Sequence, residues 1–243
     1  MRAGAAGTPL DSAQAAAADA GLKEMMPFGR PFLDFVLHAL ADAGIREAAL
    51  VLGPEHERVR EYYRALPTTR ITIRFVEQAH PLGTADAVWS ARDWTGQAPF
   101  IVLNADNLYP GQVLTQLAAG TGLALPGFAR DSLGIPIERI GSFALLETDA
   151  RGRLTRITEK PGVEAVRLAG PDALISMNIW RFDDRILEPC RDVPLSPRGE
   201  RELPQAVALA VERGADLEVF PARGPVLDLS RREDVPAVAQ ALE

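Results

Sequence analysis

Short apolar runs alternate with helical patterns along the first half of this 243-residue chain. Between Pro31 and Ala43, apolar side chains recur at the spacing of one helical face, and Gly44 follows the last of them. Residues 48–52 are apolar throughout and end at a Gly-Pro pair, which predicts a buried strand. The same criteria predict helices over 11–20, 55–65, 83–94 and 112–119, and strands over 70–76 and 99–103. This alternation is typical of a parallel sheet with helices on both faces.

The pattern changes in the second half of the chain. Residues 142–148 and 154–158 flank an Asp-Ala-Arg-Gly turn, which predicts a hairpin of two strands. We also expect strands over 173–182, 217–220 and 226–229, a helix over 202–212, and a last helix that Ser230 caps together with Glu233. The predicted fold class is α/β, with a Rossmann-like, mixed, mostly parallel sheet and helices on both faces. We expect a single domain over 1–243, made of the halves 1–130 and 131–243.

Composition and charge narrow the class of protein. The single cysteine, Cys190, excludes an internal disulfide and a cysteine-built zinc site, and three scattered histidines cannot form a histidine-rich metal site. A net charge of −7 argues against a general nucleic-acid or anionic-membrane surface. No apolar stretch approaches the ~20 residues of a membrane span, and the N-terminus lacks a secretory pattern. We therefore expect a cytoplasmic protein that binds neither nucleic acid nor membrane.

The basic residues are almost all arginines. Of 26 lysines and arginines, only Lys23 and Lys160 are lysines. A GC-rich coding sequence accounts for the arginine excess. Lysine carries a compact charge on a thin stem, so a site that needs such a charge beside a phosphate would keep it. The two lysines are therefore candidates for phosphate contacts.

Two aspartates lie where apolar strands end. Asp106 follows the buried run 101–103, and ligands of open α/β sheets bind at the carboxyl ends of strands. Its oxygens suit a hard cation such as Mg²⁺, although a turn-forming role is the alternative. Asp228 is flanked by apolar residues and needs a partner if it is buried. A metal shared with Asp106 would supply that partner, and a helix cap or an arginine is the alternative.

Two further segments carry polar groups suited to a nucleotide or a sugar phosphate. Gln78 offers a donor and an acceptor for a base edge, and Gly83 lets a flat ligand approach the backbone. Thr84 opens a helix whose N-terminal amides favour an anion, unless the segment is only a turn that Thr84 caps. Glu159 can accept from sugar hydroxyls and Lys160 can neutralise a phosphate, unless the two are a surface charge pair.

In this order the segments resemble the sugar-1-phosphate nucleotidyltransferase family over nearly the whole chain. The matching strings are KEMMP at 23–27 with GRP at 29–31, PLGTADA at 81–87, LNADN at 103–107, EKP at 159–161, Asn178, and LDL at 227–229. The resemblance implies a fold of the nucleotide-diphospho-sugar transferase type. It also implies Mg²⁺-dependent nucleotidyl transfer from an NTP to a sugar 1-phosphate, which gives an NDP-sugar and pyrophosphate.

The resemblance also implies a role for each matching position. It makes 1–130 the nucleotide-binding half and 131–243 the sugar-binding half. The implied roles are Lys23 at the triphosphate, Gln78, Gly83 and Thr84 at the nucleotide, Asp106 and Asp228 at Mg²⁺, Gly141, Glu159 and Asn178 at the sugar, and Lys160 at its phosphate. The chemistry requires positioning and positive charge more than a general base, because the attacking phosphate oxygen is already an anion.

The N-terminus departs from the family pattern. Such enzymes open with an apolar strand and a glycine-rich loop that ends in Gly-Thr-Arg. Here the similar string GAAGTPL at 4–10 has no strand before it, and Pro9 stands where the arginine belongs. We therefore expect the true loop to lie upstream of Met1 and this chain to be poorly active.

Two other functions remain open at this stage. The first is a non-catalytic nucleotide- or sugar-binding relative, which the departure at the N-terminus favours and the two aspartates and two lysines oppose. The second is a glycosyltransferase that uses a nucleotide sugar. Such enzymes usually carry Asp-x-Asp after the strand, and Asn104-Ala105-Asp106 has only one acid. The base, the sugar and the formation of a homo-oligomer are not specified by the sequence.

Overall fold

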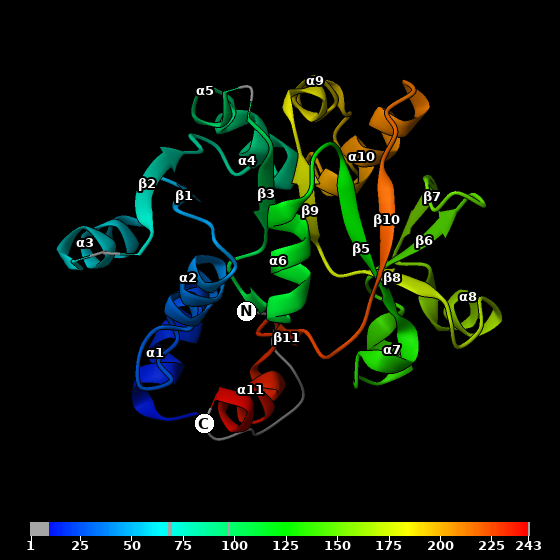
Figure 1. Cartoon of the computed structure of the whole chain (residues 1–243). Coiled ribbons are helices and arrows are strands. Elements are labelled where there is room, and N and C mark those ends of the chain that lie inside the picture. Colours follow the sequence, from blue (N-terminus) through cyan, green and yellow to red (C-terminus); the bar gives the residue numbers. More distant parts are fainter. Residues whose placement is uncertain (1–9, 68–69, 97, 243) are drawn as a thin grey trace.

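The computed structural model describes residues 10–67, 70–96 and 98–242 (Figure 1). Its helices are α1 (Ser12–Asp19), α2 (Phe32–Asp42), α3 (Glu57–Ala65), α4 (Thr84–Ser90), α5 (Arg92–Thr95), α6 (Gly111–Ala119), α7 (Ile137–Ile140), α8 (Gly162–Leu168), α9 (Leu187–Asp192), α10 (Leu203–Glu212) and α11 (Val235–Leu242). Its strands are β1 (Glu47–Leu52), β2 (Thr72–Glu77), β3 (Phe100–Leu103), β4 (Asn107–Leu108), β5 (Ala124–Ala129), β6 (Ala144–Thr148), β7 (Leu154–Glu159), β8 (Leu174–Ser176), β9 (Ile179–Phe182), β10 (Glu218–Ala222) and β11 (Leu227–Asp228).

The central sheet has seven strands. Six follow the order β3-β9-β5-β8-β6-β7, and β10 pairs with β5. Only the β10–β5 pair in this sheet is parallel. The prediction of a mostly parallel sheet is therefore wrong, although the α/β class is confirmed. An apolar run specifies a buried strand but not its direction, and short connections such as the β6–β7 turn permit only antiparallel pairing.

Helices cover both faces of this sheet, as predicted. Side chains that alternate along β5 enter two separate hydrophobic clusters. Phe128 packs in the cluster that α2, α6 and α11 share, whereas Leu125 packs in the cluster of α4, α9 and α10. Cys190 is fully buried in the second cluster, as a small apolar residue would be. The two clusters are the cores above and below the sheet.

Most predicted elements are present near their expected bounds. The helix α2 follows Pro31, which is its N-cap residue. The helix α1 begins with a capping box, in which the Asp11 carboxylate accepts from the Gln14 amide. The strands β6 and β7 form the predicted hairpin, with Leu145 opposite Thr158.

Three expectations about elements are wrong, and one central strand was missed. The helix predicted over 83–94 divides into α4 and α5 at Ala91. The strand predicted over 173–182 divides into β8 and β9, because Asn178 adopts a left-handed φ of 58°. Ser230 does not cap the last helix; Arg231 precedes a 3-10 turn, and α11 follows it. The central strand β5 was not predicted, since its sequence ALPGFA contains proline and glycine.

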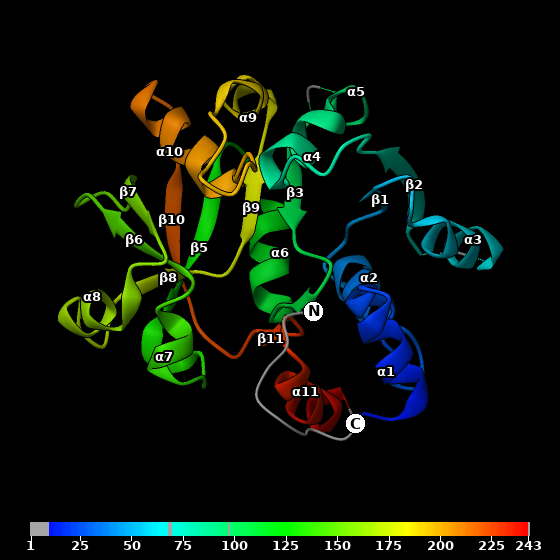
Figure 2. The ribbon, with the colours of Figure 1, turned by 180° about the vertical axis from the view of Figure 1, so that it is seen from behind.

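A cleft separates the β1–β2 pair from the central sheet. Among the described residues, β1 pairs only with β2 and β3 pairs only with β9. A cavity of about 920 Å³, here called the interstrand cleft, is lined by all residues of β1 and β3. Seen from both sides, the β1–β2 pair stands apart from β3 (Figures 1 and 2). Lys23, Thr84 and Asp106 also line this cleft.

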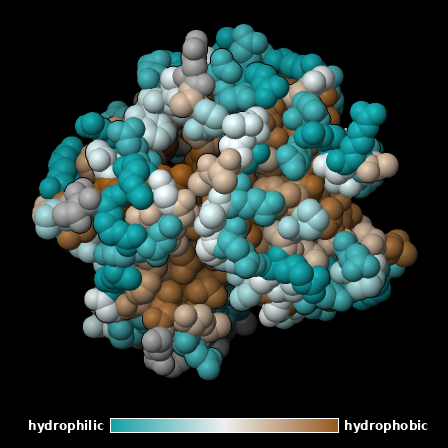
Figure 3. Space-filling view, viewed as in Figure 1, coloured by the Kyte–Doolittle hydropathy of each residue, from teal (hydrophilic) through white to brown (hydrophobic). Residues whose placement is uncertain are grey.

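The surface is mixed in polarity. Hydrophilic residues cover much of the rim of the face in Figure 3, and hydrophobic residues gather in its lower part, between the regions of α2 and α11. Within the described residues, no helix has the length and apolar character needed to cross a membrane.

Candidate active site

The short β4–β11 ladder brings the two predicted metal ligands to one place. Asp228 in β11 lies opposite Asn107 in β4, the residue that follows Asp106. The next amide of β11, that of Leu229, donates to the carbonyl oxygen of Asp106 at 2.9 Å. Two carboxylates that are over 120 residues apart in sequence are therefore held on neighbouring strand ends. This edge lies where β3 ends, as the position of Asp106 predicted.

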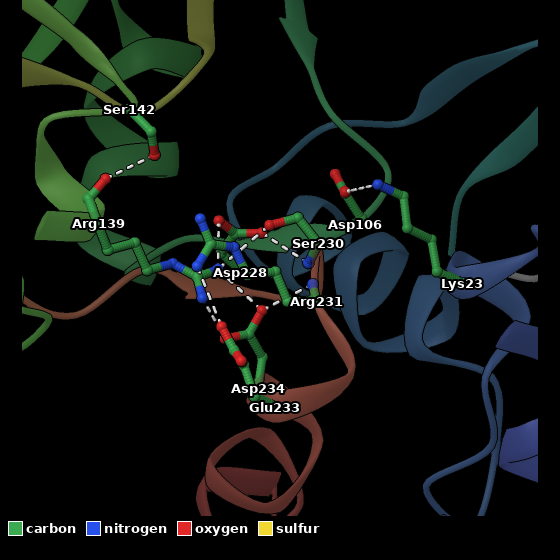
Figure 4. Close-up of polar contacts among 9 residues, drawn as sticks. All are labelled: Lys23, Asp106, Arg139, Ser142, Asp228, Ser230, Arg231, Glu233 and Asp234. Carbon is green, nitrogen blue, oxygen red and sulfur yellow. Dashed lines mark hydrogen bonds and ion pairs between the residues drawn. The ribbon is translucent and has the colours of Figure 1, made fainter. Parts of the chain in front are cut away.

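Lys23 forms an ion pair with Asp106 (Figure 4). Lys23 begins a 3-10 turn over Lys23–Met25, between α1 and α2. The Asp106 side chain is 10 % exposed, whereas that of Lys23 is 31 % exposed. An ammonium that is one-third exposed at the mouth of a cleft can exchange its carboxylate for another anion.

Asp228 is paired with an arginine. The Arg139 guanidinium donates to Asp228 at 2.9 Å and to Asp234 at 2.8 Å (Figure 4). It also contacts the Ser230 hydroxyl at 3.2 Å, while the Ser230 amide donates to Asp228. Burial alone would lower the pKa of Arg139, and the hydrogen bonds to Asp234 and Asp228 raise it above its ordinary value. Asp228 thus has an arginine partner in the structure.

The predicted nucleotide-binding loop is a compact unit. The Gln78 side-chain amide donates to the Gly83 carbonyl at 3.0 Å and to the Asp86 carboxylate at 2.9 Å. The Thr84 hydroxyl accepts from an amide at the start of α10. Gly83 has a φ of 103°, and a Cβ there would lie 2.5 Å from the Arg201 carbonyl oxygen. Packing against this backbone is enough to require glycine at position 83.

A second group of predicted residues lies around the end of the β6–β7 hairpin. The amide of Gly162 donates to Gly141 at 3.1 Å, and the amide of Lys160 donates to the carbonyl oxygen of Phe143. A Cβ on Gly141 would lie 2.9 Å from the backbone of Gly162. Gly141 and the segment that contains Glu159 and Lys160 are therefore in direct contact.

Backbone strain is concentrated at two predicted site residues. Among the described non-glycine residues, only Lys160 (φ 46°) and Asn178 (φ 58°) have positive φ. This conformation costs a side-chain-bearing residue roughly 1–2 kcal/mol, although asparagine tolerates it better than lysine. Strained residues of this kind cluster at functional sites. The Lys160 side chain is exposed, so burial of its ammonium is not the cause.

Glu159 lies partly buried beside these residues. Burial raises the pKa of its carboxyl group, while the charge of Lys160 lowers it and that of Glu202 raises it further. No hydrogen bond to the Glu159 carboxylate is present among the described residues. A partly buried carboxylate whose oxygens have no hydrogen-bond donor can accept hydrogen bonds from the hydroxyl groups of a ligand.

The predicted residues thus form three groups. Lys23, Asp106 and Asp228 form one, Gln78, Gly83 and Thr84 the second, and Gly141, Glu159 and Lys160 the third. Asn178 lies near the first group, since its carbonyl oxygen accepts from the Tyr109 hydroxyl, one residue after β4. Arg139 connects the first and third groups, because it binds Asp228 and lies two residues before Gly141.

Sequence reasoning missed Arg139, Arg201 and Tyr109 as site residues. Arg201 closes the loop at 82–86: its amide donates to Leu82 at 2.6 Å, and its carbonyl oxygen accepts from Ala85. In a chain whose cations are nearly all arginines, no local signal distinguishes Arg139 or Arg201 from surface residues. Tyr109 could have been suspected, since it follows the motif that contains Asp106.

The sequence profile of the family described as Nucleotidyl transferase matches residues 19–228. This chain belongs to the nucleotidyl transferase family. The match covers Lys23, both aspartates and every other predicted site residue. It confirms the resemblance drawn from the motifs.

Curated relatives of this family member are identical to it at about a quarter of the aligned positions. A low-salt glycan biosynthesis nucleotidyltransferase of Haloferax volcanii is 26 % identical over 223 residues, which are 88 % of this chain and 58 % of the relative. A glucose-1-phosphate thymidylyltransferase of Streptomyces antibioticus is 28 % identical over 78 % of this chain and 51 % of its own length. The chain therefore spans about half the length of the curated relatives that it matches.

Solved structures of similar shape support the fold assigned to this chain. UDP-glucose pyrophosphorylase complexed with UDP-glucose superposes with a TM-score of 0.74 at 17 % identity, covering 90 % of this chain and 89 % of the other. The UTP-bound enzyme from Acinetobacter baumannii gives a TM-score of 0.70 at 19 % identity, with coverage of 90 % and 85 %. The nucleotide-diphospho-sugar transferase fold is thereby confirmed.

Proposed function

We propose that this chain carries the site of a Mg²⁺-dependent nucleotidyl transfer from an NTP to a sugar 1-phosphate, which yields an NDP-sugar and pyrophosphate. The observation that carries the proposal is the β4–β11 ladder, which holds Asp106 and Asp228 on neighbouring strand ends with Lys23 beside them. Membership of the nucleotidyl transferase family supports it. The relatives named for glucose-1-phosphate thymidylyl transfer and for UDP-glucose support this class of substrates.

The two aspartates fit the demands of Mg²⁺. This ion is usually held by one or two carboxylates, with substrate phosphates and water completing its shell. In the described chain, no group of three or more His, Cys, Asp or Glu side chains could form an all-protein metal site. Asp106 and Asp228 would hold the ion, and when bound it would neutralise charge on the phosphate oxygens.

Lys23 is placed to bind the triphosphate. Its ammonium pairs with Asp106 at the mouth of the interstrand cleft and remains 31 % exposed. An arriving phosphate competes for this ammonium, which then offsets the negative charge that develops on the leaving pyrophosphate. Arg139 keeps Asp228 in place through its forked hydrogen bonds to Asp228 and Asp234.

Glu159 and Lys160 orient the acceptor. The partly buried Glu159 carboxylate accepts from sugar hydroxyls, and the Lys160 ammonium binds the sugar phosphate. A phosphate oxygen of the sugar attacks the α-phosphorus of the NTP. The new P–O bond forms as the bond from the α-phosphorus to the bridging oxygen of pyrophosphate breaks. The nucleophile is already ionised, so no side chain has to remove a proton.

The direct test is release of pyrophosphate in the presence of Mg²⁺, across the common NTPs and a panel of sugar 1-phosphates. We expect slow release with a restricted set of pairs, in keeping with the low activity that the N-terminal departure from the family pattern predicts. Asp106→Asn should reduce the rate about 100-fold or more, because one metal carboxylate is lost. The exposed Glu212→Gln variant is the matched control and should keep the full rate.

Other products would contradict the proposal and identify the alternative. Nucleotide binding by calorimetry without pyrophosphate from any pair indicates a non-catalytic relative. Release of a nucleoside diphosphate from a nucleotide sugar indicates a glycosyltransferase. Full activity of Asp106→Asn would contradict the role of that carboxylate.

A further inference from the structure

The Gln78 side chain is held at the carboxyl end of the β1–β2 pair. Gln78 follows β2 directly, and its main-chain amide donates to the carbonyl oxygen of Leu52, the last residue of β1, at 3.0 Å. In parallel strands this end of the sheet is the side on which ligands bind. The direction in which the Gln78 amide group points therefore decides what a ligand meets there.

Two acceptors fix the orientation of this amide group. Its nitrogen, Nε2, donates to the Gly83 carbonyl oxygen at 3.0 Å and to a carboxylate oxygen of Asp86 at 2.9 Å. A side-chain amide nitrogen carries two N–H groups, so both are used. The reverse orientation would set the amide oxygen of Gln78 against two oxygens that cannot donate, and both hydrogen bonds would be lost.

Asp86 is itself held by Arg201. Asp86 lies in the first turn of α4, and its side chain is 13 % exposed. One of its carboxylate oxygens accepts from Gln78, and the other accepts from the Arg201 guanidinium at 3.4 Å. The main chain of Arg201 is bonded to the same loop, through Leu82 and Ala85. Asp86 is therefore fixed on one side and fixes Gln78 on the other.

The groups that this arrangement leaves free are one acceptor and one donor. The amide oxygen of Gln78, Oε1, has no donor among the described residues. It is open to solvent, because the buried side-chain polar atoms without a partner in the described chain are Ser176 Oγ and Arg201 Nε. The main-chain N–H of Gly83, which precedes α4, has no acceptor within the described ranges either. A ligand at this loop thus meets an acceptor from Gln78 and a donor from Gly83.

An acceptor beside a donor is complementary to an N–H group beside a carbonyl group. Uracil and thymine carry a carbonyl on each side of their ring N–H, so they match this pair whichever side the Gly83 amide lies on. Cytosine, guanine and adenine have a donor beside an acceptor on one side only. If the Gln78 amide were reversed, the loop would offer two donors, which suit the adjacent ring nitrogen and carbonyl oxygen of cytosine. The orientation of Gln78 therefore discriminates between two pyrimidines of the same shape.

We infer that Asp86 is a positioning residue, which holds the Gln78 amide oxygen outward and so makes the loop at 78–86 select uracil or thymine over cytosine. The inference rests on the proposed function, in which an NTP binds this chain, and adds the class of base. Position 86 requires a carboxylate, because one of its oxygens serves Gln78 and the other serves Arg201. The single acceptor oxygen of an asparagine can serve only one of them.

The test measures the dissociation constants of UTP, dTTP and CTP for the full chain with Mg²⁺, by titration calorimetry. We expect UTP or dTTP to bind at least about 30-fold more tightly than CTP, because the wrong base edge leaves polar groups unpaired. Asp86→Leu keeps the shape of the side chain and removes both acceptors. It should lower this ratio at least about five-fold, by weakening UTP and strengthening CTP. The matched control is Asp93→Leu in α5, where the aspartate is 89 % exposed, and it should keep the ratio.

The ratio separates positioning from a general structural effect. A variant that only loosened the loop would weaken UTP and CTP equally, so an unchanged ratio in Asp86→Leu would overturn the inference. If the leucine variant does not fold, Asp86→Ala takes its place with the same expected fall. Asp86→Asn should give a ratio between those of the wild type and the leucine variant, because its oxygen serves Gln78 only part of the time.

The wild type tests the choice of base without any substitution. A UTP analogue methylated at N3 lacks the ring N–H and should bind no more tightly than CTP; binding equal to that of UTP would overturn the inference. Tighter binding of CTP, ATP or GTP than of UTP and dTTP would overturn it as well. These results would leave the proposed function intact, because nucleotidyl transfer requires an NTP but no particular base. Binding of no NTP would overturn the proposed function together with the inference.

Discussion

At the scale of single residues, Lys160 and Asn178 show how the backbone serves the candidate site. Both adopt left-handed φ values that no other described non-glycine residue shares. Asn178 separates β8 from β9 and points its carbonyl oxygen at the Tyr109 hydroxyl. Lys160 follows β7 directly, so its strained turn changes the direction of the chain where Glu159 and its own ammonium are presented.

Replacing Lys160 separates the backbone conformation from the charge. Lys160→Ala and Lys160→Gly both remove the ammonium, but only glycine relieves the positive φ. We expect the glycine variant to be more stable than the alanine variant by about 0.5–1 kcal/mol. Both should lose pyrophosphate-forming activity to the same extent. Chemical denaturation and the pyrophosphate assay measure the two effects, and equal stability of the two variants would argue against strain at this residue.

The Glu159 carboxyl group makes stability depend on pH. Its pKa is raised by burial in the folded chain, so the folded state binds more protons than the unfolded state between the two pKa values. Stability from this group is present at low pH and falls as pH rises through that window. Glu159→Gln should therefore raise the melting temperature at pH 7.5 but not at about pH 4, while lowering activity.

The control for Glu159→Gln lies on the neighbouring strand. Glu147 is exposed in β6, 3.9 Å from the Arg156 guanidinium. Glu147→Gln should leave the melting temperature unchanged at both values of pH. A melting temperature of Glu159→Gln that equals the wild type at pH 7.5 would mean that burial does not penalise this carboxylate.

Single site residues could be proposed from the sequence where motifs occur in the same order as in the family. The strings at 23–27, 81–87, 103–107 and 159–161 identified residues that the structure gathers into three groups. Arg139 could not be predicted, because its importance comes from two acids about 90 residues further along the chain. Such pairings depend on topology, which local sequence does not encode.

At the scale of elements, Arg139 of α7 binds β11 and the 3-10 turn over Arg232–Asp234 that precedes α11. Its side chain is 12 % exposed, and those of Asp228 and Asp234 are 9 % and 14 % exposed. Removal of one partner from a buried ion pair leaves the other charges uncompensated. Arg139→Ala should therefore destabilise the chain by about 3 kcal/mol, measured by chemical denaturation.

An exposed arginine provides the matched comparison for Arg139. Arg185 forms a similar forked pair with Asp183, but its side chain is 53 % exposed. Arg185→Ala should cost less than about 1 kcal/mol. Similar losses in the two variants would indicate that the Arg139 pair is effectively solvated. A loss confined to Arg139→Ala would support its structural role beside Asp228.

Helices and strands were predicted correctly where their apolar residues follow one regular pattern from end to end. The helix α2 and the strands β1, β2 and β3 match their expected positions within about two residues. The strand β5 was missed because Pro126 and Gly127 interrupt its pattern. Gly127 is required by packing, since a Cβ there would lie 2.9 Å from Val219. Packing between strands, rather than local propensity, thus decides this element.

At the scale of the whole molecule, the interstrand cleft divides the strands into separately paired sets. In the described chain, no strand pairing joins β1 and β2 to the central sheet. We expect the hydrogen bonds within the β1–β2 pair to open at lower free energy than those of β5 and β9. Native-state hydrogen exchange at low denaturant concentrations measures the difference, and a common opening of both sets would contradict it.

The sequence did not predict whether neighbouring strands of the central sheet run parallel or antiparallel. Alternating strand and helix patterns favoured a mostly parallel sheet, but β9 lies between β3 and β5 and runs antiparallel to both. The order of strands depends on contacts between segments 50 to 100 residues apart. Periodicity within a segment carries no information about them.

The parallel pair β5–β10 can form only late in synthesis, because β10 lies far along the chain from β5. Ala124 of β5 lies opposite Glu218 of β10, so the middle of the sheet is completed by residues near the end of the sequence. While the ribosome is still translating the intervening segment, one edge of the buried strand β5 has no partner. Contacts of such large sequence separation slow folding and leave apolar strands open to aggregation. The nascent chain therefore exposes an unpaired edge of β5 until β10 has been synthesised.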